Sequence, residues 1–137
     1  MRATLDTNVL VSALEFGGIP GQLLDLNTDE AFTLCMSPAI IAELTRVLGK
    51  RFEWAEDDIN ENLTPIVSRA VIVTPTAEVI ASPDPDDDRI LECAVESKSD
   101  VIVTGDDHLL RLGTFERIPI VTPREFLESL LEGKERP

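Results

Sequence analysis

Two patterns of hydrophobic and polar positions alternate along the chain of 137 residues. Short, continuous apolar runs rich in β-branched residues predict strands, and longer segments with apolar residues three and four positions apart predict helices. The predicted strands cover residues 2–5, 33–36, 70–74, 101–104 and 118–121. The predicted helices cover residues 8–16, 20–26, 38–50, 56–67, 89–96 and 106–112, and a closing helix follows residues 122–125.

Strong helix starts support this assignment. Ser37-Pro38 places a capping serine before a proline in the first helical position, and Thr122 to Glu125 combines a cap, a proline and a capping-box glutamate. Strands that alternate with helices indicate an α/β fold. We therefore expect a three-layer sandwich with a mostly parallel sheet of four or five strands. The length suits a single domain that spans residues 1–137.

The composition narrows the class of protein. Hydrophobic residues make up 43% of the chain, which argues against disorder. The two cysteines, Cys35 and Cys93, lie in apolar surroundings and have no zinc or disulfide spacing, so we expect buried free thiols. No run approaches the ~20 apolar residues that span a membrane. The charged N-terminus does not resemble a secretory signal, and we expect a cytoplasmic protein without a membrane partner.

The net charge of −14, from 26 acidic and 12 basic residues, weighs against a nucleic-acid substrate. Phosphate binding is normally driven by basic side chains that release counterions. Two explanations of the acidity stay open. Divalent ions can reverse the local charge of an acidic site. Alternatively, the acids form a solvated surface, as in proteins of a salt-rich cytoplasm, where salt screens their repulsion.

Several acids are predicted to meet at one edge of the sheet. Asp6 ends the first strand, Asp106 follows the strand at 101–104 by two residues, and the aspartates in 84–88 precede a helix. Ligands of open parallel sheets bind beyond the carboxyl ends of the strands, where these positions fall. Glu43 lies nearly two turns into its helix on the polar side and can lean over the same edge.

Converging carboxylates repel one another unless a cation neutralises them. Hard oxygen ligands without histidine or cysteine favour Mg²⁺ or Mn²⁺. Such ions activate water and stabilise in-line displacement at phosphorus. A phosphodiester is the substrate that this chemistry suits best.

Four segments resemble, in the same order, the motifs of PIN-domain nucleases. They are Leu5-Asp6-Thr7-Asn8 with the apolar residues that follow, Ser37 to Leu44, Asp84 to Ala94, and Thr104 to Leu110; the segment Thr122 to Leu127 is similar to the usual ending. Each motif alone is weakly specific, whereas the ordered set over residues 5–110 is highly specific. The chain is most similar to the branch of toxin components of toxin–antitoxin systems, the VapC-type toxins.

The resemblance implies a Mg²⁺- or Mn²⁺-dependent endoribonuclease that forms a homodimer and is inhibited by a small antitoxin protein. It implies that Asp6, Glu43, Asp87 and Asp106 are both the catalytic residues and the metal ligands. Asp87 stands seven residues before Ala94, as in the family, and Asp88 is the alternative.

Other residues near these motifs have more than one reading. Asp84 reads as a turn residue beside Pro85, and Asp86 and Asp88 as loop or first-turn charges. Asn8 could cap the first helix, position a water, or both. Thr104 is either a simple strand end or, as in PIN relatives, a residue near the metals.

The closing segment has an apolar side that suits a homodimer interface, made of Phe126, Leu127, Leu130 and Leu131.

Two other classes of function fit parts of the pattern. A phospho-acceptor receiver domain has a similar length and clustered aspartates, but it needs a lysine after the last strand, where Val121-Thr122-Pro123-Arg124 offers none. A PIN fold that has lost activity and serves as a binding module is the other alternative. The presence of all four acids favours the enzyme.

Overall fold

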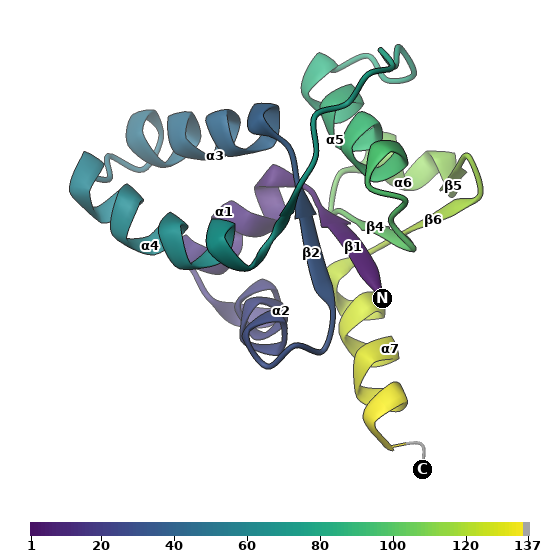
Figure 1. The fold of residues 1–137 in the computed structure, drawn as a ribbon, viewed down its shortest axis with the longest axis horizontal. Helices are drawn as coiled ribbons and strands as arrows, with labels where there is room; N and C mark the ends of the chain where they lie inside the picture. Colours follow the sequence, from purple (N-terminus) through teal and green to yellow (C-terminus); the bar gives the residue numbers. More distant parts are fainter. Residues whose placement is uncertain (136–137) are drawn as a thin grey trace.

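The computed structural model describes residues 1–135, which form a six-stranded sheet with helices on both sides (Figure 1). In chain order the elements are β1 Arg2–Leu5, α1 Thr7–Glu15, α2 Gly18–Thr28, β2 Thr33–Met36, α3 Pro38–Lys50, α4 Glu56–Arg69, β3 Val71–Ile72, α5 Pro85–Glu96, β4 Val101–Val103, α6 Asp107–Leu112, β5 Thr114–Phe115, β6 Ile118–Val121 and α7 Pro123–Glu135. The strand order is β3-β2-β1-β4-β6-β5, and every pair is parallel except β5 with β6. The predicted fold class is confirmed, with six strands in place of four or five.

The sheet is covered on both faces. In Figure 1, α1 to α4 gather on one side of β1 and β2, whereas α5 and α6 lie on the other side. α5 packs on β1, β2 and β4, and α7 packs against α2. Ala3, Thr4 and Leu5 of β1 are buried, as are all three residues of β4, because parallel strands between two helical layers have no solvent face.

The register aligns the carboxyl ends of the two central strands. Leu5 of β1 pairs with Val103 of β4, and the Asp6 amide donates to the Val103 carbonyl at 2.9 Å. The residues that follow β1 and β4 therefore begin their helices side by side.

The start of α5 differs from the prediction. The helix begins at Pro85, four residues before the predicted start at Arg89. The Asp84 side chain accepts a hydrogen bond from the Asp86 amide and caps the helix, and Pro85 occupies the first turn. The three aspartates 86–88 lie in that turn, where the helix dipole favours negative charge. Residues 85–88, which were predicted to precede the helix, thus belong to it, and Asp84, which was predicted to be a turn residue, is its cap.

Strand β5 was not predicted. It forms a two-residue antiparallel hairpin with β6 through Glu116 and Arg117, whose φ angles are +47° and +68°. A tight hairpin turn of this kind requires positive φ at both central residues and usually carries Asn or Gly there. Glu-Arg gives no such signal, so the sequence pattern could not indicate the turn.

The closing helix is less exposed than its pattern suggested. Phe126 is buried against Phe32, with ring centroids 5.0 Å apart, and Leu127 is buried too. Two of the four residues expected at a homodimer interface therefore belong to the core of their own chain. Leu131 remains 44% exposed. The prediction of buried free cysteines is confirmed for Cys35 and Cys93.

Within residues 1–135 no single helix has the length and apolar character needed to cross a membrane. Only α1 and α2 together pass that test, and the two helices are bent by 97° at their junction.

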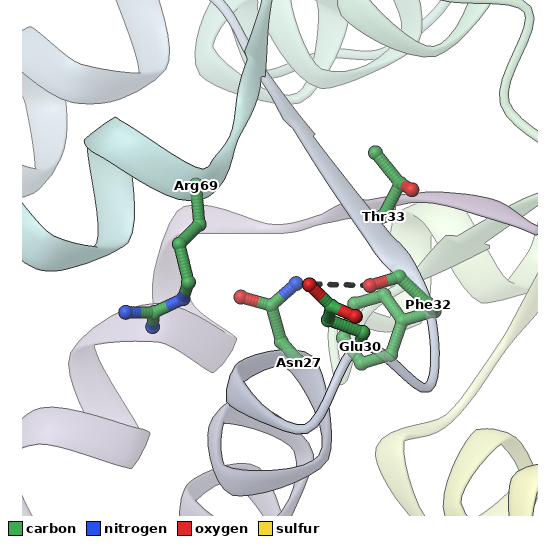
Figure 2. Close-up of a pocket in the computed structure, with 5 residues that line it drawn as sticks. All are labelled: Asn27, Glu30, Phe32, Thr33 and Arg69. Atoms are coloured by element: carbon green, nitrogen blue, oxygen red, sulfur yellow. Dashed lines mark hydrogen bonds between the residues drawn. The ribbon is translucent and has the colours of Figure 1, made fainter.

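A polar cavity of about 300 Å³ lies at the amino end of β2, at the opposite edge of the sheet from the predicted site (Figure 2). The Asn27 side chain donates to the Phe32 carbonyl at 3.0 Å, and its buried Oδ1 has no hydrogen-bond partner among residues 1–135. Figure 2 shows this oxygen directed toward the side of Arg69. None of the predicted acids lines this cavity.

Candidate active site

Asp6 is fixed by hydrogen bonds on both carboxylate oxygens. It is the N-cap of α1 and only 5% exposed. Its Oδ1 accepts from the Asn8 amide at 3.2 Å, and its Oδ2 accepts from the Thr104 hydroxyl at 2.7 Å. Because Asp6 is the cap, the alternative that Asn8 caps the first helix is wrong. The exposed Asn8 side chain is left for other contacts.

Asp106 stands in the equivalent place after β4. It is the N-cap of α6, and its Oδ1 accepts from the His108 amide at 3.3 Å. Its own amide donates to the Thr104 hydroxyl oxygen at 3.0 Å. Thr104 is fully buried and joins the two acids, because its hydroxyl oxygen accepts a hydrogen bond from the Asp106 amide and its hydroxyl group donates one to Asp6.

Adjacent aspartates on α5 have different surroundings. Asp87 faces the other acids, and its Oδ2 accepts from the Ser82 hydroxyl at 3.1 Å. The Oδ1 of Asp88 instead accepts from the amides of Ala81 and Ser82, at 3.0 and 2.8 Å. Both side chains are buried. Asp88 therefore holds the loop before α5, and this loop brings Ser82 to Asp87.

Glu43 approaches from α3. The Thr7 hydroxyl, at the start of α1, donates to its Oε2 at 3.3 Å. Asp86, which is exposed in the first turn of α5, also lies beside Glu43. Asp86 was read only as a loop or first-turn charge, and its position here depends on how α5 crosses α3.

The electrostatics show how closely the acids are grouped. Burial, and then the charge of Asp86, raises the pKa of Glu43 to about 7, although the Thr7 hydroxyl opposes the shift. Burial and a hydrogen bond with Asp106 raise the pKa of Asp87 to about 7, and the charge of Asp6 adds to this. Burial also raises the pKa of Asp6, against the hydrogen bonds from Thr104 and Asn8. The structure thus brings all four predicted site residues into one mutually repelling group.

The donor set suits a divalent cation. The acids offer hard oxygen ligands, and the ion pair within residues 1–135, Arg89 with Glu92, does not involve them. In that part of the chain, no three His, Cys, Asp or Glu side chains are already arranged to hold a metal ion. A cation would therefore need to draw the carboxylates inward, which their mutual repulsion opposes while the site carries no positive charge.

A cleft of about 280 Å³ opens beside Asp106. We call it the side cleft, and it is lined by Asn8, Val9, Ser12, Pro20, Gly105, Asp106 and Pro123. Its walls come from α1, from the starts of α2 and α7, and from the turn between β4 and α6. A substrate group can therefore lie directly next to the acids.

Three hydroxyl groups support the acids, and sequence reasoning noted only Thr104. Thr7 was visible in the first motif as a polar neighbour of Asp6. Ser82 lies in a segment without hydrophobic periodicity, so no pattern could connect it to Asp87.

Comparisons with known proteins identify the family of this chain and structures with a similar fold. The family model described as PIN domain matches residues 2–108. An uncharacterised protein of Methanocaldococcus jannaschii is 33% identical, over 94% of this chain and 91% of that protein.

Two solved structures share the fold. VapBC2 from Rickettsia felis, bound to a DNA fragment from its promoter, has a TM-score of 0.63 at 17% identity, over 89% of this chain and 98% of its own. FitAcB from Neisseria gonorrhoeae has a TM-score of 0.55 at 18% identity, also over 89% and 98%. At these identities the likeness shows the fold alone.

Proposed function

This chain belongs to the PIN-domain family, whose members are nucleases, and from that premise we propose that it is a metal-dependent endoribonuclease. The observation that carries the proposal is the group of four carboxylates, Asp6, Glu43, Asp87 and Asp106, at the carboxyl edge of the sheet. Their repulsion is best relieved by a divalent cation, and PIN nucleases generally use one.

We propose Mg²⁺ or Mn²⁺ as the cofactor, held by the four acids. When bound, the ion would supply an activated water and neutralise charge that develops at phosphorus. Thr104 holds Asp6 in one orientation and, through the Asp106 amide, fixes the start of α6. Ser82 and Thr7 do the same for Asp87 and Glu43. These hydroxyl groups therefore limit how far the acids have to move when a cation draws them together.

RNA is the proposed substrate. The cation would also reduce the repulsion between an acidic chain and a phosphate backbone, since it neutralises part of the negative charge at the site. We place this activity in the cytoplasm.

The test is cleavage of single-stranded RNA with Mn²⁺. Asp6→Asn and Asp106→Asn should each abolish it while the fold persists, because each replaces a proposed ligand without changing core volume. Equal cleavage by the wild type and both variants, purified in parallel, would point to a contaminating nuclease and reject the proposal. Absence of cleavage by the wild type on every RNA offered, with or without metal, would favour an inactive binding module.

We also propose that the protein is the toxin of a toxin–antitoxin pair. The fold neighbours are toxin components of such systems, and their structures contain both proteins, VapB with VapC and FitA with FitB. The proposed partner is a small antitoxin. Expression of the chain should stop growth, and coexpression of that antitoxin, but not of an unrelated small protein, should restore it.

We propose a homodimer as well; of the apolar side of the closing segment that was expected to form its interface, Leu131 on α7 remains exposed. A light-scattering mass of one chain at every concentration would reject it.

A further inference from the structure

The side cleft differs in chemistry from the acid cluster that it adjoins. Among the residues that the structure describes, no lysine or arginine lines it, and its one charged residue is Asp106, which is itself one of the four acids. A phosphate would find no positive partner there, and the carboxylates would repel it. An uncharged part of the substrate is therefore the better occupant.

The walls of the side cleft combine apolar surfaces with two neutral polar groups. Val9, Pro20 and Pro123 supply the apolar surfaces. Asn8 and Ser12 lie four residues apart, on the same face of α1, and supply a carboxamide and a hydroxyl. Within the described residues neither side chain makes a hydrogen bond to the rest of the chain, so both can bind a ligand.

The volume of the side cleft leaves room for one small group. The volume of about 280 Å³ lies just below the usual range of pockets for drug-sized ligands, ~300–1,000 Å³. Gly105 is exposed, and a Cβ atom there would meet nothing within 4 Å, so no neighbouring side chain closes the cleft at this turn. Apolar walls contact the faces of a nucleobase, and donors and acceptors at one side contact its edge.

We infer that the side cleft holds one nucleobase of the RNA, next to the phosphodiester that is cleaved, and that Ser12 and Asn8 contact its polar edge. The inference rests on the proposed ribonuclease function and adds a base preference to it. Ser12 is then a specificity-determining residue. Ser12 lies one helical turn after Asn8 on α1 and is not one of the proposed catalytic residues.

The first experiment is sequencing of RNA ends after partial digestion of a random single-stranded pool. The wild type should prefer one base, or one base class, at a fixed position beside the cut. Ser12→Ala should weaken that preference by roughly tenfold, as when one hydrogen bond to a base is lost. Ser12→Phe, which fills the cleft, should raise KM for the pool with a smaller change in kcat. The matched control is Ser68→Ala on the exposed surface of α4, which should leave both unchanged.

The inference would be overturned if Ser12→Phe melts at the same temperature as the wild type and keeps the same base preference and the same KM. If wild-type cleavage itself proves independent of Asp6, the proposed ribonuclease function fails instead.

A second experiment tests base binding separately from the ribonuclease function, because it needs neither metal nor cleavage. The four ribonucleosides, which lack phosphate, are titrated in EDTA while backbone amide shifts are recorded by NMR. At least one nucleoside should move the amides of Ser12 and Gly105, and this response should vanish in Ser12→Phe. If no nucleoside moves these amides, or if Ser12→Phe responds like the wild type, the side cleft does not bind a base.

Discussion

Each of three acids in the candidate site is oriented by a hydroxyl group from a distant or neighbouring segment. Thr104 donates to Asp6 across 98 positions of sequence, and Ser82 donates to Asp87 across five. Asp6, Asp87 and Asp106 could be predicted from the sequence because each follows a strand end or opens a helix at one edge of the sheet, whereas Glu43, well inside α3, depended more on the resemblance to the PIN motifs. Ser82 could not be predicted, since its contact depends on the path of an irregular loop that Asp88 holds.

Thr104 should act as a positioning residue. Thr104→Val keeps its shape but leaves Asp6 Oδ2 and the Asp106 amide without their partner, so we expect a loss of about 1–3 kcal/mol in the free energy of unfolding. Cleavage should fall by roughly 10–100-fold, and half-maximal activity should need more Mn²⁺. Thr104→Ser retains the hydroxyl group and should restore both the cleavage rate and the Mn²⁺ requirement of the wild type. A Thr104→Val enzyme with unaltered Mn²⁺ dependence would show that the residue only contributes to stability.

Asp87 and Asp88 offer a matched pair of substitutions. Asp87→Asn should lower the cleavage rate by roughly a hundredfold, because it removes a proposed metal ligand. Asp88→Asn keeps an oxygen that can accept from the same two amides, so activity and folding should largely persist. Rates are compared under single-turnover conditions on one RNA. The reverse order of activities would move the third ligand one residue along the chain.

At the scale of elements, helices with strong capping signals were predicted well and irregular connections were not. α3 begins at Pro38 after Ser37, whose side chain accepts from the Ile40 amide, as the residues indicated. α5 was predicted to start four residues late, because Asp84-Pro85 was read as a turn although the same pair can cap and open a helix. The approach of Asp86 to Glu43 depends on how α3 and α5 cross, which no local pattern contains.

The hairpin between β5 and β6 gives a prediction at this scale. Glu116 and Arg117 both adopt positive φ, a conformation that costs an ordinary residue about 1–2 kcal/mol. Glu116→Asn with Arg117→Gly should therefore raise the free energy of unfolding by about 1 kcal/mol, measured in urea. Cleavage should be unchanged, since neither residue lies in the site. If the free energy of unfolding falls instead, the Glu116 or Arg117 side chain makes contacts that outweigh the backbone strain.

At the scale of the whole molecule, the net charge of −14 and the clustered acids act on stability together. The pKa values of Glu43 and Asp87 are about 7 in the folded protein and near 4 in an unfolded chain. Between these values the folded state binds more protons than the unfolded state. In EDTA, the free energy of unfolding should therefore fall as pH rises from about 4 to about 7. The double variant Glu43→Gln, Asp87→Asn should flatten this fall; an equal fall would assign it to the overall charge.

Divalent metal should reverse this trend. A cation that binds only the folded protein stabilises it by roughly 2.7 kcal/mol at a hundredfold excess over its dissociation constant. Mn²⁺ should raise the melting temperature by several degrees, and by more at pH 7.5 than at pH 5, because the carboxylates must lose their protons to bind. A monovalent salt at matched ionic strength controls for screening. Asp6→Asn relieves one repulsion, so without metal it should melt at or above the wild type, yet it should gain less from Mn²⁺. If both proteins gain equally, the ion does not bind at Asp6, and the site formed by the four carboxylates is wrong.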